Sequence, residues 1–285
     1  MRITVPICST LIILSLFGAG CSTANTADHQ SRTMPIGQVM VNSQIADEQK
    51  LPSGFERREI SYADGRKVSL IVIPFKSDEW AWSLANDPTQ PKSVRAWREM
   101  LDADLVINGS YFEENYQPSG YYFGPNVINE KTWPSREQQN EPASYSGLAR
   151  VHDGKLELAY LTAHPQDKPK DDEQAFLTYP TLLAEGKSLV SEDSKKYARR
   201  TILAQDAGGT NFIIITESGA TSLYETAKWI ADQPEKFQIA INLDGGPSTG
   251  LSFKKDDETF EIPSAPIPNV VTATRKPSYL PLPRE

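Results

Sequence analysis

The stretch INLDGGPSTGL, residues 241–251, places groups that can do chemistry directly after an apolar run. Asn242 and Asp244 follow this run, and a glycine pair and two hydroxyl residues come next. A carboxylate at the end of a buried strand loses part of its hydration, so it can serve as a proton donor or a nucleophile. The same residues also suit a tight turn or a ligand cradle. Taken alone, the stretch leaves these three interpretations open.

Two further stretches carry polar groups at the ends of apolar segments. In INGSYF, Asn108 and Gly109 follow an apolar run, and in ARRTIL, Arg199 and Arg200 precede one. Glycine lets the backbone approach a ligand closely, and arginine offers a planar fork that matches phosphate oxygens. Each stretch alone also fits a plain turn or a solvated arginine pair.

Several other kinds of site are not indicated. The three histidines, His29, His152 and His164, lack the spacing of metal ligands, so we expect no metal site. No cysteine follows Cys21, and there is neither a nucleophile elbow nor a phosphate-binding Gly-Lys-Thr loop. Carboxylates, amides, arginines and hydroxyls must therefore carry any chemistry, and the sequence identifies no cofactor.

The elements that must position these groups are mostly short strands joined by tight turns. Hairpins are expected around Asp64-Gly65, Asp153-Gly154 and Gly208-Gly209, with a fourth over 249–263. Apolar spacing predicts helices over 93–103, where Ser93 can cap the start and Val94, Trp97 and Leu101 fall on one face, and over 222–232. We therefore predict a single α+β domain, a mixed, largely antiparallel sheet with helices packed on it.

Two long segments, 112–144 and 162–175, are predicted to be loops. Loops of this length in a compact domain are usually functional or disordered. Aromatic residues concentrate in and beside the first one, where they either face a ligand or pack the loop onto its own domain. They are Tyr111, Tyr116, Tyr121, Tyr122 and Trp133.

The first 50 residues predict export and a flexible tether. Arg2, a short apolar run and small residues before Cys21 form a secretory signal over 1–20. The position of Cys21 resembles a bacterial lipobox, which implies lipidation of that cysteine and attachment to the cell envelope. Ser22 after it would favour the outer membrane of a two-membrane cell. An ordinary signal peptide with an incidental cysteine is the alternative. Residues 21–50 are small and polar, as in a tether, and leave 51–285 as the domain.

The balance of charge bears on the class of partner. The chain has 29 basic and 37 acidic residues, which gives a net charge of -8. An acidic protein is a poor match for nucleic acid. An anionic substrate remains compatible with this balance, because a single local arginine can outweigh the global field.

Five stretches in one order resemble the phosphodiester glycosidase family. They are INGSYF, YPTLLAEGK, RRTIL, SLYETAKWIA and INLDGGPSTGL, and the resemblance spans Val68 to Arg275. The family includes an enzyme that removes N-acetylglucosamine from a phosphodiester on mannose, and some exported bacterial members are linked to exopolysaccharide. Ser110 and Pro247 stand where the family usually has glycine, and Pro247 removes one backbone donor.

The resemblance implies a site for a glycan or sugar phosphate. Asp244 becomes the candidate acid, base or nucleophile, with Glu113 as a second carboxylate, because glycoside hydrolysis usually uses two. Arg200 would hold phosphate oxygens, and the amides of Gly245 and Gly246 would cradle an oxyanion. The full set of implied substrate-binding residues is Asn108, Gly109, Arg200, Asn242, Gly245, Gly246, Ser248 and Thr249.

Three functions follow from this pattern. The first is an exported, lipid-anchored hydrolase that cleaves a sugar-1-phosphodiester in an envelope or extracellular glycan. The second is a glycan-binding envelope lipoprotein that keeps the pocket without turnover. The third is a structural envelope protein in which the Asp-Gly-Gly run is only a turn.

Overall fold

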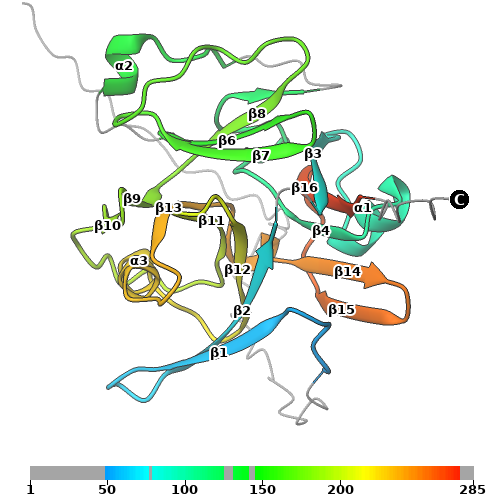
Figure 1. Cartoon of the computed structure of the whole chain (residues 1–285), viewed down its shortest axis with the longest axis vertical. Coiled ribbons are helices and arrows are strands. Elements are labelled where there is room, and N and C mark those ends of the chain that lie inside the picture. The colour runs from blue at the N-terminus through cyan, green and yellow to red at the C-terminus, as the bar shows by residue number, and fades with distance from the viewer. Residues whose placement is uncertain (1–48, 77–78, 125–130, 141–144, 277–285) are drawn as a thin grey trace, which may run out of the picture. The chain divides into compact units, whose positions relative to one another are not determined.

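The computed structural model describes residues 49–76, 79–124, 131–140 and 145–276, which belong to one compact unit (Figure 1). The predicted signal peptide, Cys21 and nearly all of the predicted tether lie outside the described residues. Within the described ranges, no helix is both long enough and apolar enough to cross a membrane.

The largest sheet has seven strands and contains the apolar run that leads into the Asp-Gly-Gly stretch. Every pairing within it is antiparallel. In spatial order its strands are β1 (Glu56–Ser61), β2 (Lys67–Phe75), β12 (Asn211–Ser218), β11 (Thr201–Asp206), β13 (Phe237–Asn242), β9 (Thr181–Ala184) and β10 (Lys187–Ser188).

Two smaller antiparallel sheets complete the β structure. The five-stranded sheet is ordered β15 (Glu258–Ile262), β14 (Leu251–Lys255), β4 (Leu105–Asn108), β16 (Asn269–Arg275) and β3 (Trp80–Asn86). The four-stranded sheet is ordered β5 (Tyr122–Phe123), β8 (Gln174–Thr178), β6 (Gly147–His152) and β7 (Lys155–Tyr160).

The helices are few and short. They are α1 (Val94–Leu101), α2 (Arg136–Asn140) and α3 (Leu223–Ala231), with a 3-10 turn, η1, over Gly246–Ser248. Ser93 accepts a hydrogen bond from the first turn of α1, and Ser222 forms a reciprocal capping box with Glu225 at the start of α3. These caps satisfy backbone donors that have no partner within the helix.

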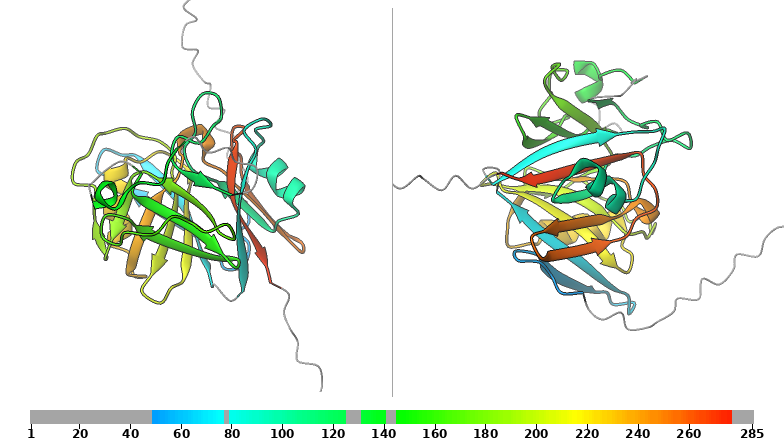
Figure 2. Two further views of the ribbon diagram at one scale, coloured as in Figure 1. Left: turned by 90° about the horizontal axis from the view of Figure 1, so that it is seen from above. Right: turned by 90° about the vertical axis from the view of Figure 1, so that its right-hand side faces the viewer.

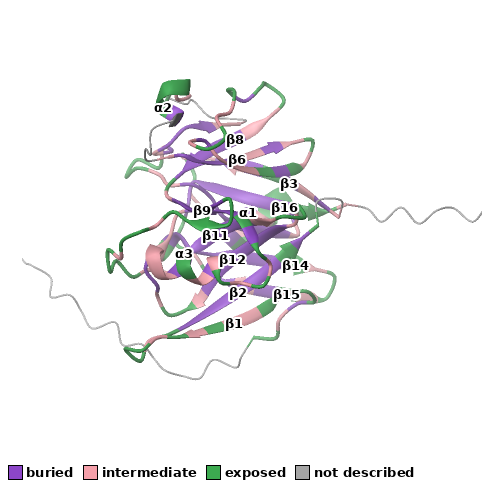
Figure 3. Ribbon diagram, turned by 60° about the vertical axis from the view of Figure 1, so that its left-hand side comes forward, coloured by how far each residue is buried: buried purple, intermediate pink, exposed green. Residues whose placement is uncertain are grey.

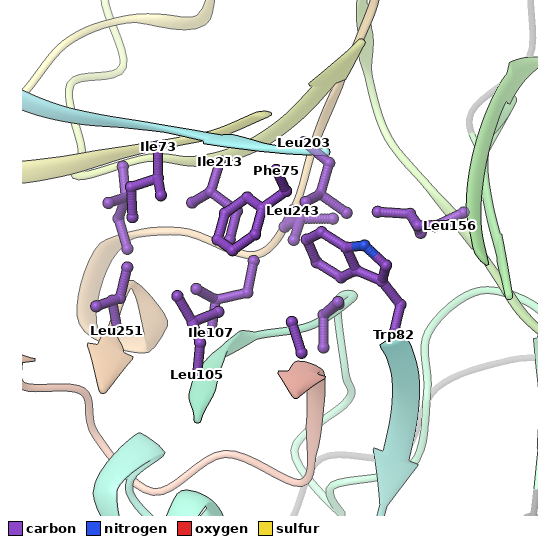
Figure 4. Packing of buried hydrophobic residues seen from close by; sticks show 14 of the residues in the cluster. Ile73, Phe75, Trp82, Leu105, Ile107, Leu156, Leu203, Ile213, Leu243 and Leu251 are labelled. Carbon is purple, nitrogen blue, oxygen red and sulfur yellow. The ribbon is translucent and has the colours of Figure 1, made fainter. Parts of the chain in front are cut away.

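One apolar core receives side chains from all three sheets (Figure 4). Ile73 and Phe75 of β2, Leu105 and Ile107 of β4 and Leu156 of β7 all belong to it. Burying these side chains removes apolar surface from water, which is the main favourable term in folding. The three sheets are therefore held together by one continuous core (Figure 3).

The helices cover the outer faces of two different sheets. Ala227 and Ile230 of α3 belong to one apolar cluster with Leu182 and Leu183 of the seven-stranded sheet, where α3 lies against β9, β10 and β13. Val94 and Trp97 of α1 pack with Val106 and Val270 on the five-stranded sheet, and α1 lies before that sheet in the right-hand view of Figure 2. Seven of the nine residues of β2 are buried, because its side chains alternate between the apolar cluster that includes α3 on one face and the shared core on the other.

The four predicted hairpins and the two predicted helices are confirmed, and the antiparallel character is also confirmed. The prediction of one mixed sheet is wrong, because the described strands divide among three sheets in which every pairing is antiparallel. Leu101 was expected on the buried face of its helix, yet it is 38% exposed at the last turn of α1. The strands β3 and β16 were not predicted, because no turn sequence of the hairpin kind separates either from a neighbour in the chain.

The long segment 112–144 is only partly a loop. It contains β5 and α2, although residues 125–130 and 141–144 lie outside the described residues. Tyr121 and Tyr122 are buried, and Trp133 meets the Tyr121 ring edge-on at 5.1 Å. Most of its aromatic residues therefore pack the segment onto its own domain; Tyr111, just before it, is the exception considered below.

Candidate active site

The predicted site residues meet where strands of two different sheets end. Asn108 is the last residue of β4 in the five-stranded sheet, whereas Asn242 ends β13 in the seven-stranded sheet. The amide of Leu243 donates to the Thr201 carbonyl at 2.8 Å, and the amide of Asp244 donates to the Gly109 carbonyl at 3.1 Å. Asp244 therefore lies at the junction between the two sheets.

The side chain of Asn108 holds this junction together. Its Oδ1 accepts hydrogen bonds from Thr201 Oγ1 at 2.7 Å and from the Gly250 amide at 3.2 Å. Its Nδ2 donates to the Asp244 carbonyl at 2.7 Å. Asn108 is 1% exposed, so its side chain holds the backbone beneath the site together and cannot contact a substrate. The prediction that it binds substrate directly is corrected accordingly.

Gly109 also has a packing role. A Cβ at this position would lie 2.1 Å from Oδ1 of Asn269, a distance that real atoms do not tolerate. Asn269 in turn donates to the Ser110 carbonyl at 3.2 Å. The residues after β4 are therefore fixed against β16 and do not form a ligand cradle.

The two glycines after Asp244 are required by the backbone. A Cβ on Gly245 would lie 2.8 Å from the Arg199 carbonyl, so only glycine permits this close approach. Gly246 has φ of +59°, in the left-handed region that favours glycine. Pro247 follows within the short 3-10 turn, where its fixed φ is tolerated, and its carbonyl accepts from the Ala265 amide at 2.9 Å.

The prediction that these glycine amides cradle an oxyanion is wrong for this conformation. The Gly245 amide donates to Oδ1 of Asp244 at 2.8 Å, and the Gly246 amide donates to the Arg199 carbonyl at 2.9 Å. Pro247 has no amide proton to offer. An anion must therefore be bound by side chains at this site.

Asp244 is a half-buried carboxyl group with few compensating contacts. Burial raises the pKa of Asp244 above its ordinary value, although hydrogen bonds from the Ser248 hydroxyl and the Gly245 amide oppose this shift. A carboxylate that holds its proton more tightly is a stronger base once ionised. The environment thus suits proton transfer better than that of an exposed aspartate.

Arg200 presents a buried positive charge. It is 7% exposed, and its Nε and Nη2 donate to the carbonyls of Thr221 at 3.1 Å and Lys196 at 2.7 Å. Among the described residues no carboxylate pairs with it, and burial lowers its pKa, although an arginine stays protonated in proteins. Its Nη1 lies toward Gly245. A fixed guanidinium without a counterion is suited to an anionic ligand.

Arg199 makes different contacts from Arg200. Its Nη2 donates to the carbonyls of Thr249 at 2.9 Å and Pro263 at 3.3 Å, and its Nε donates to the Gly246 carbonyl at 3.4 Å. It holds the loop that follows Asp244. The choice of Arg200 over Arg199 as the anion-binding residue agrees with this division.

Tyr111, which the sequence analysis named only among the aromatic residues in and beside the first long loop, completes the site. Asn242 Nδ2 donates to the Tyr111 hydroxyl at 2.5 Å, which leaves the phenol proton free to point elsewhere. Burial raises the pKa of Tyr111, and the Asp244 charge raises it further, whereas the Arg200 charge lowers it. Tyr111 therefore lies within the electrostatic reach of both charged residues and stays a protonated donor.

Asn242 and two hydroxyl residues are buried around this group. Asn242 is 0% exposed, and its Oδ1 has no hydrogen-bond partner among the described residues. Ser248 is buried and hydrogen-bonded to Asp244, whereas the hydroxyl of the fully buried Thr249 has no partner within the described part of the chain. Ser248 can tune Asp244, but Thr249 lies too deep to contact a substrate.

The second predicted carboxylate, Glu113, lies at an exposed turn. Its amide donates to the Gln117 carbonyl at 2.8 Å. Tyr145 connects it to the site: burial raises the pKa of Tyr145, and the charges of both Glu113 and Asp244 add to that rise. Glu113 is therefore near the site, but the solvent around it gives it none of the burial that distinguishes Asp244.

Tyr145 and Tyr179 form an aromatic border beside the site. Their ring centroids are 6.4 Å apart, and Tyr179 is 48% exposed. The Tyr179 carbonyl also accepts a weak hydrogen bond from Asn242 at 3.3 Å. Neither residue was predicted, because they come from separate segments that only the fold brings together. No group of metal-ligating side chains occurs among the described residues.

The comparisons with known proteins agree with this geometry. The family model of the phosphodiester glycosidases matches residues 102–274. The chain belongs to the phosphodiester glycosidase family. The matched range contains every predicted catalytic and substrate-binding residue from Asn108 to Thr249. A search of curated proteins gives no significant match.

Solved structures share the fold of this phosphodiester glycosidase family member. One is the catalytic domain of zebrafish N-acetylglucosamine-1-phosphodiester alpha-N-acetylglucosaminidase, auto-inhibited by its pro-peptide, with a TM-score of 0.55 and 16% identity over 78% of this chain and 82% of that one. Another is a hypothetical protein from Synechocystis, with a TM-score of 0.52 and 13% identity over 78% of this chain and 62% of that one. Identities this low show a common fold alone.

Removing the Asn108 side chain should destabilise the domain strongly. Asn108→Ala leaves three hydrogen-bonding groups without their partner, and a buried unsatisfied group costs about 1–3 kcal/mol. We expect a loss of about 3 kcal/mol or more in the free energy of unfolding, measured by urea denaturation. The matched control, Thr201→Val, removes one of these bonds while keeping the shape and should cost about 1 kcal/mol. Equal losses in the two variants would contradict the role assigned to Asn108.

Proposed function

We propose that this chain is an exported hydrolase that cleaves a sugar-1-phosphodiester in an envelope or extracellular glycan. The observation that carries the proposal is the pairing of a buried, counterion-free Arg200 with the half-buried carboxyl of Asp244 around Tyr111. Membership of a family of glycosidases supports hydrolysis as the reaction type. Export and lipid attachment at Cys21 are part of the proposal and rest on the sequence alone.

The substrate matches the charges of the site. A phosphodiester carries one negative charge on its two free oxygens, and Nη1 of Arg200 can donate to them while Nε and Nη2 stay on the Thr221 and Lys196 carbonyls. The Tyr111 hydroxyl is a neutral donor beside it, because its phenol proton is not used by Asn242. The side chains of Arg200 and Tyr111 would therefore bind the phosphate in place of the amides of Gly245 and Gly246, which already donate hydrogen bonds within the protein.

The chemistry needs a base more than an acid. When the bond between the sugar carbon and the phosphate oxygen breaks, the electron pair leaves with a phosphate monoester, whose charge Arg200 stabilises. Water forms the new bond to the sugar carbon, and its proton passes to Asp244 and then to solvent. The products are a free sugar and a phosphate monoester, and no further reactant is needed.

The sugar has room beside the site. A groove of about 360 Å³ has Tyr179, Pro180, Thr181, Leu189 and Val190 among its lining residues, and the Tyr179 carbonyl also accepts from Asn242 of the site. An exposed tyrosine ring can pack against the C–H face of a sugar while its neighbours supply polar contacts. We assign the glycan part of the substrate to this groove.

A non-catalytic glycan-binding lipoprotein remains the second candidate. The observation in its favour is that residues 245–247 offer no free amide to a developing negative charge. Such a protein would keep the affinity of Arg200 for phosphate without turnover. Assay of the folded domain on a nitrophenyl-sugar phosphodiester decides between the two functions, because only the hydrolase releases nitrophenyl phosphate.

Asp244→Asn should abolish activity and stabilise the protein at neutral pH. An amide cannot take up the proton, so we expect turnover to fall by at least ~100-fold. Burial raises the folded-state pKa of Asp244 above its unfolded-state value, so the ionised carboxylate lowers the free energy of unfolding. This loss of stability develops as the pH rises from the unfolded-state pKa through the folded-state pKa. The variant should therefore melt at the same or a higher temperature at pH 7, and the difference should vanish below about pH 4.

Calorimetry across pH and a turnover assay together test both parts of this expectation. Ser248→Ala is the matched control, because it removes a hydrogen bond to Asp244 and keeps the carboxyl group. It should raise the pKa of Asp244 and move the acidic limb of the rate profile to higher pH. Wild-type turnover in a stable Asp244→Asn protein would exclude Asp244 from the mechanism.

Arg200→Lys should weaken the binding of inorganic phosphate by about one to two decades, because a charge-assisted hydrogen bond contributes roughly 1.5–3 kcal/mol. Bound phosphate raises the melting temperature of the folded protein by mass action, so a thermal titration reports the affinity. Arg199→Lys is the matched control: it also gives up hydrogen bonds to backbone carbonyls, but it should keep the response to phosphate. The same response in both variants would show that Arg200 binds no anion.

A further inference from the structure

A second cavity, of about 750 Å³, lies at the β3 edge of the five-stranded sheet, and Asp244 is not among its lining residues. Strands β3 and β16, helix α1 and the segment 87–89 border it, and Figure 1 shows these elements together on one side of the fold. Its volume falls within the range of about 300–1,000 Å³ that is typical of small-molecule sites. Neither the family match nor the proposed hydrolysis assigns a role to it.

A buried amide without partners lines this cavity. Asn86, the last residue of β3, is 6% exposed, and neither its Oδ1 nor its Nδ2 has a hydrogen-bond partner among the described residues. Its cross-strand neighbour Asn269 is occupied with Ser110. Leaving a buried amide unsatisfied is costly, so a ligand that gives Asn86 a hydrogen-bond partner would gain affinity from it.

The rest of the lining combines neutral polar groups with apolar side chains. Hydroxyl and carboxamide groups face an apolar border at α1, where Met100 is 50% exposed and Leu101 is 38% exposed. The charged lining residue is Asp87, and it is already bound by the Thr89 hydroxyl at 2.7 Å and by Lys92 at 3.2 Å. The neutral polar lining residues are Ser83, Asn86, Thr89, Gln117, Gln174, Thr272 and Thr274.

We propose that this cavity binds a neutral saccharide segment of a glycan chain. Each sugar hydroxyl both donates and accepts a hydrogen bond, which matches the neutral hydroxyl and carboxamide residues of the lining. The C–H faces of a sugar ring match Met100 and Leu101. An anionic ligand would meet no free positive charge in the lining, and an apolar ligand would leave Asn86 unsatisfied.

One loop joins this cavity to the candidate active site. Tyr111 stands at its start and Gln117, which lines the cavity, stands near its end. The Ser119 amide donates to the Tyr111 carbonyl at 3.0 Å, and the Glu113 amide donates to the Gln117 carbonyl at 2.8 Å. A saccharide on Gln117 therefore contacts the loop that carries Tyr111. The binding itself goes beyond the proposed hydrolysis and does not depend on it.

Nuclear magnetic resonance of the indole N–H groups tests this inference on the folded protein. Trp97 lines the cavity, whereas Trp229 lies on α3 against the seven-stranded sheet and serves as an internal control. The probes are neutral trisaccharides of glucose, mannose and N-acetylglucosamine, none of which carries phosphate. We expect at least one of them to shift the Trp97 signal in a saturable way while the Trp229 signal stays in place.

Asn86→Leu supplies the decisive variant. Leucine has nearly the same shape and removes an unsatisfied amide, so the melting temperature should be kept or raised while saccharide affinity falls by at least ~10-fold. Gln117→Ala, on the loop, should also weaken binding and serves if Asn86→Leu alters the fold. The exposed neighbour substitution Glu114→Gln lies outside the lining and should leave binding unchanged.

Two results would overturn the inference: no trisaccharide shifts Trp97, or Asn86→Leu and Gln117→Ala bind the active trisaccharide as the wild type does. Asp244→Asn separates this inference from the proposed function. It should bind the trisaccharide normally even though hydrolysis is lost. Inactivity of the wild type on phosphodiesters would therefore not remove the saccharide site.

Discussion

The candidate site depends on the side chain of one buried asparagine. Asn108 ends a strand of the five-stranded sheet, receives a hydrogen bond from Thr201 in the seven-stranded sheet, and donates to the carbonyl of Asp244. Its three bonds fix the relative position of the two sheets at the point where Asp244, the candidate catalytic residue, follows β13. The site is therefore assembled only when the sheets have packed on their shared core. Local structure in either sheet alone cannot form it.

The charged and polar groups around this junction lower the stability of the fold. Burial disfavours the charged forms of both Asp244 and Arg200, and neither is neutralised by an ion pair in the described part of the chain. A buried polar group without a full set of partners costs free energy, and such groups concentrate at functional sites. Asn242 and Thr249 add further unsatisfied oxygens in the same region. This concentration of unfavourable groups in one place is the physical reason to interpret it as a site and not as a turn.

The sequence predicted the local elements well, because adjacent strands and the turns between them are encoded together. The Asp153-Gly154 turn has both residues at positive φ, as a two-residue hairpin requires, and its hairpin could be predicted from that pair. Pairings between distant segments could not be predicted in this way. The pairing of β4 with β14 and β16 joins residues more than 140 positions apart, and nothing local specifies it.

The same limit applies to the site. Asp244 and Arg200 were predicted from strand-end patterns and family resemblance, and the fold brings both to Tyr111. Tyr111 stands three residues after Asn108, where a phenol directed at Asn242 could have been suspected. Tyr145 carries no local signal, and Tyr179 begins the YPTLLAEGK stretch, whose family resemblance did not mark it as a site residue. The roles of Asn108, Gly245 and Gly246 were misjudged, because a sequence shows which groups can bind a ligand but not which of them the backbone already occupies.

The central claim is that the bond broken lies between the sugar carbon and the phosphate oxygen. Hydrolysis of a sugar-1-phosphodiester in ¹⁸O-labelled water, followed by mass spectrometry of both products, tests it most directly. Attack of water at the sugar carbon places the label in the released sugar and none in the phosphate monoester. Label in the phosphate monoester instead would show attack at phosphorus, and the protein would then be a phosphodiesterase and not a glycosidase.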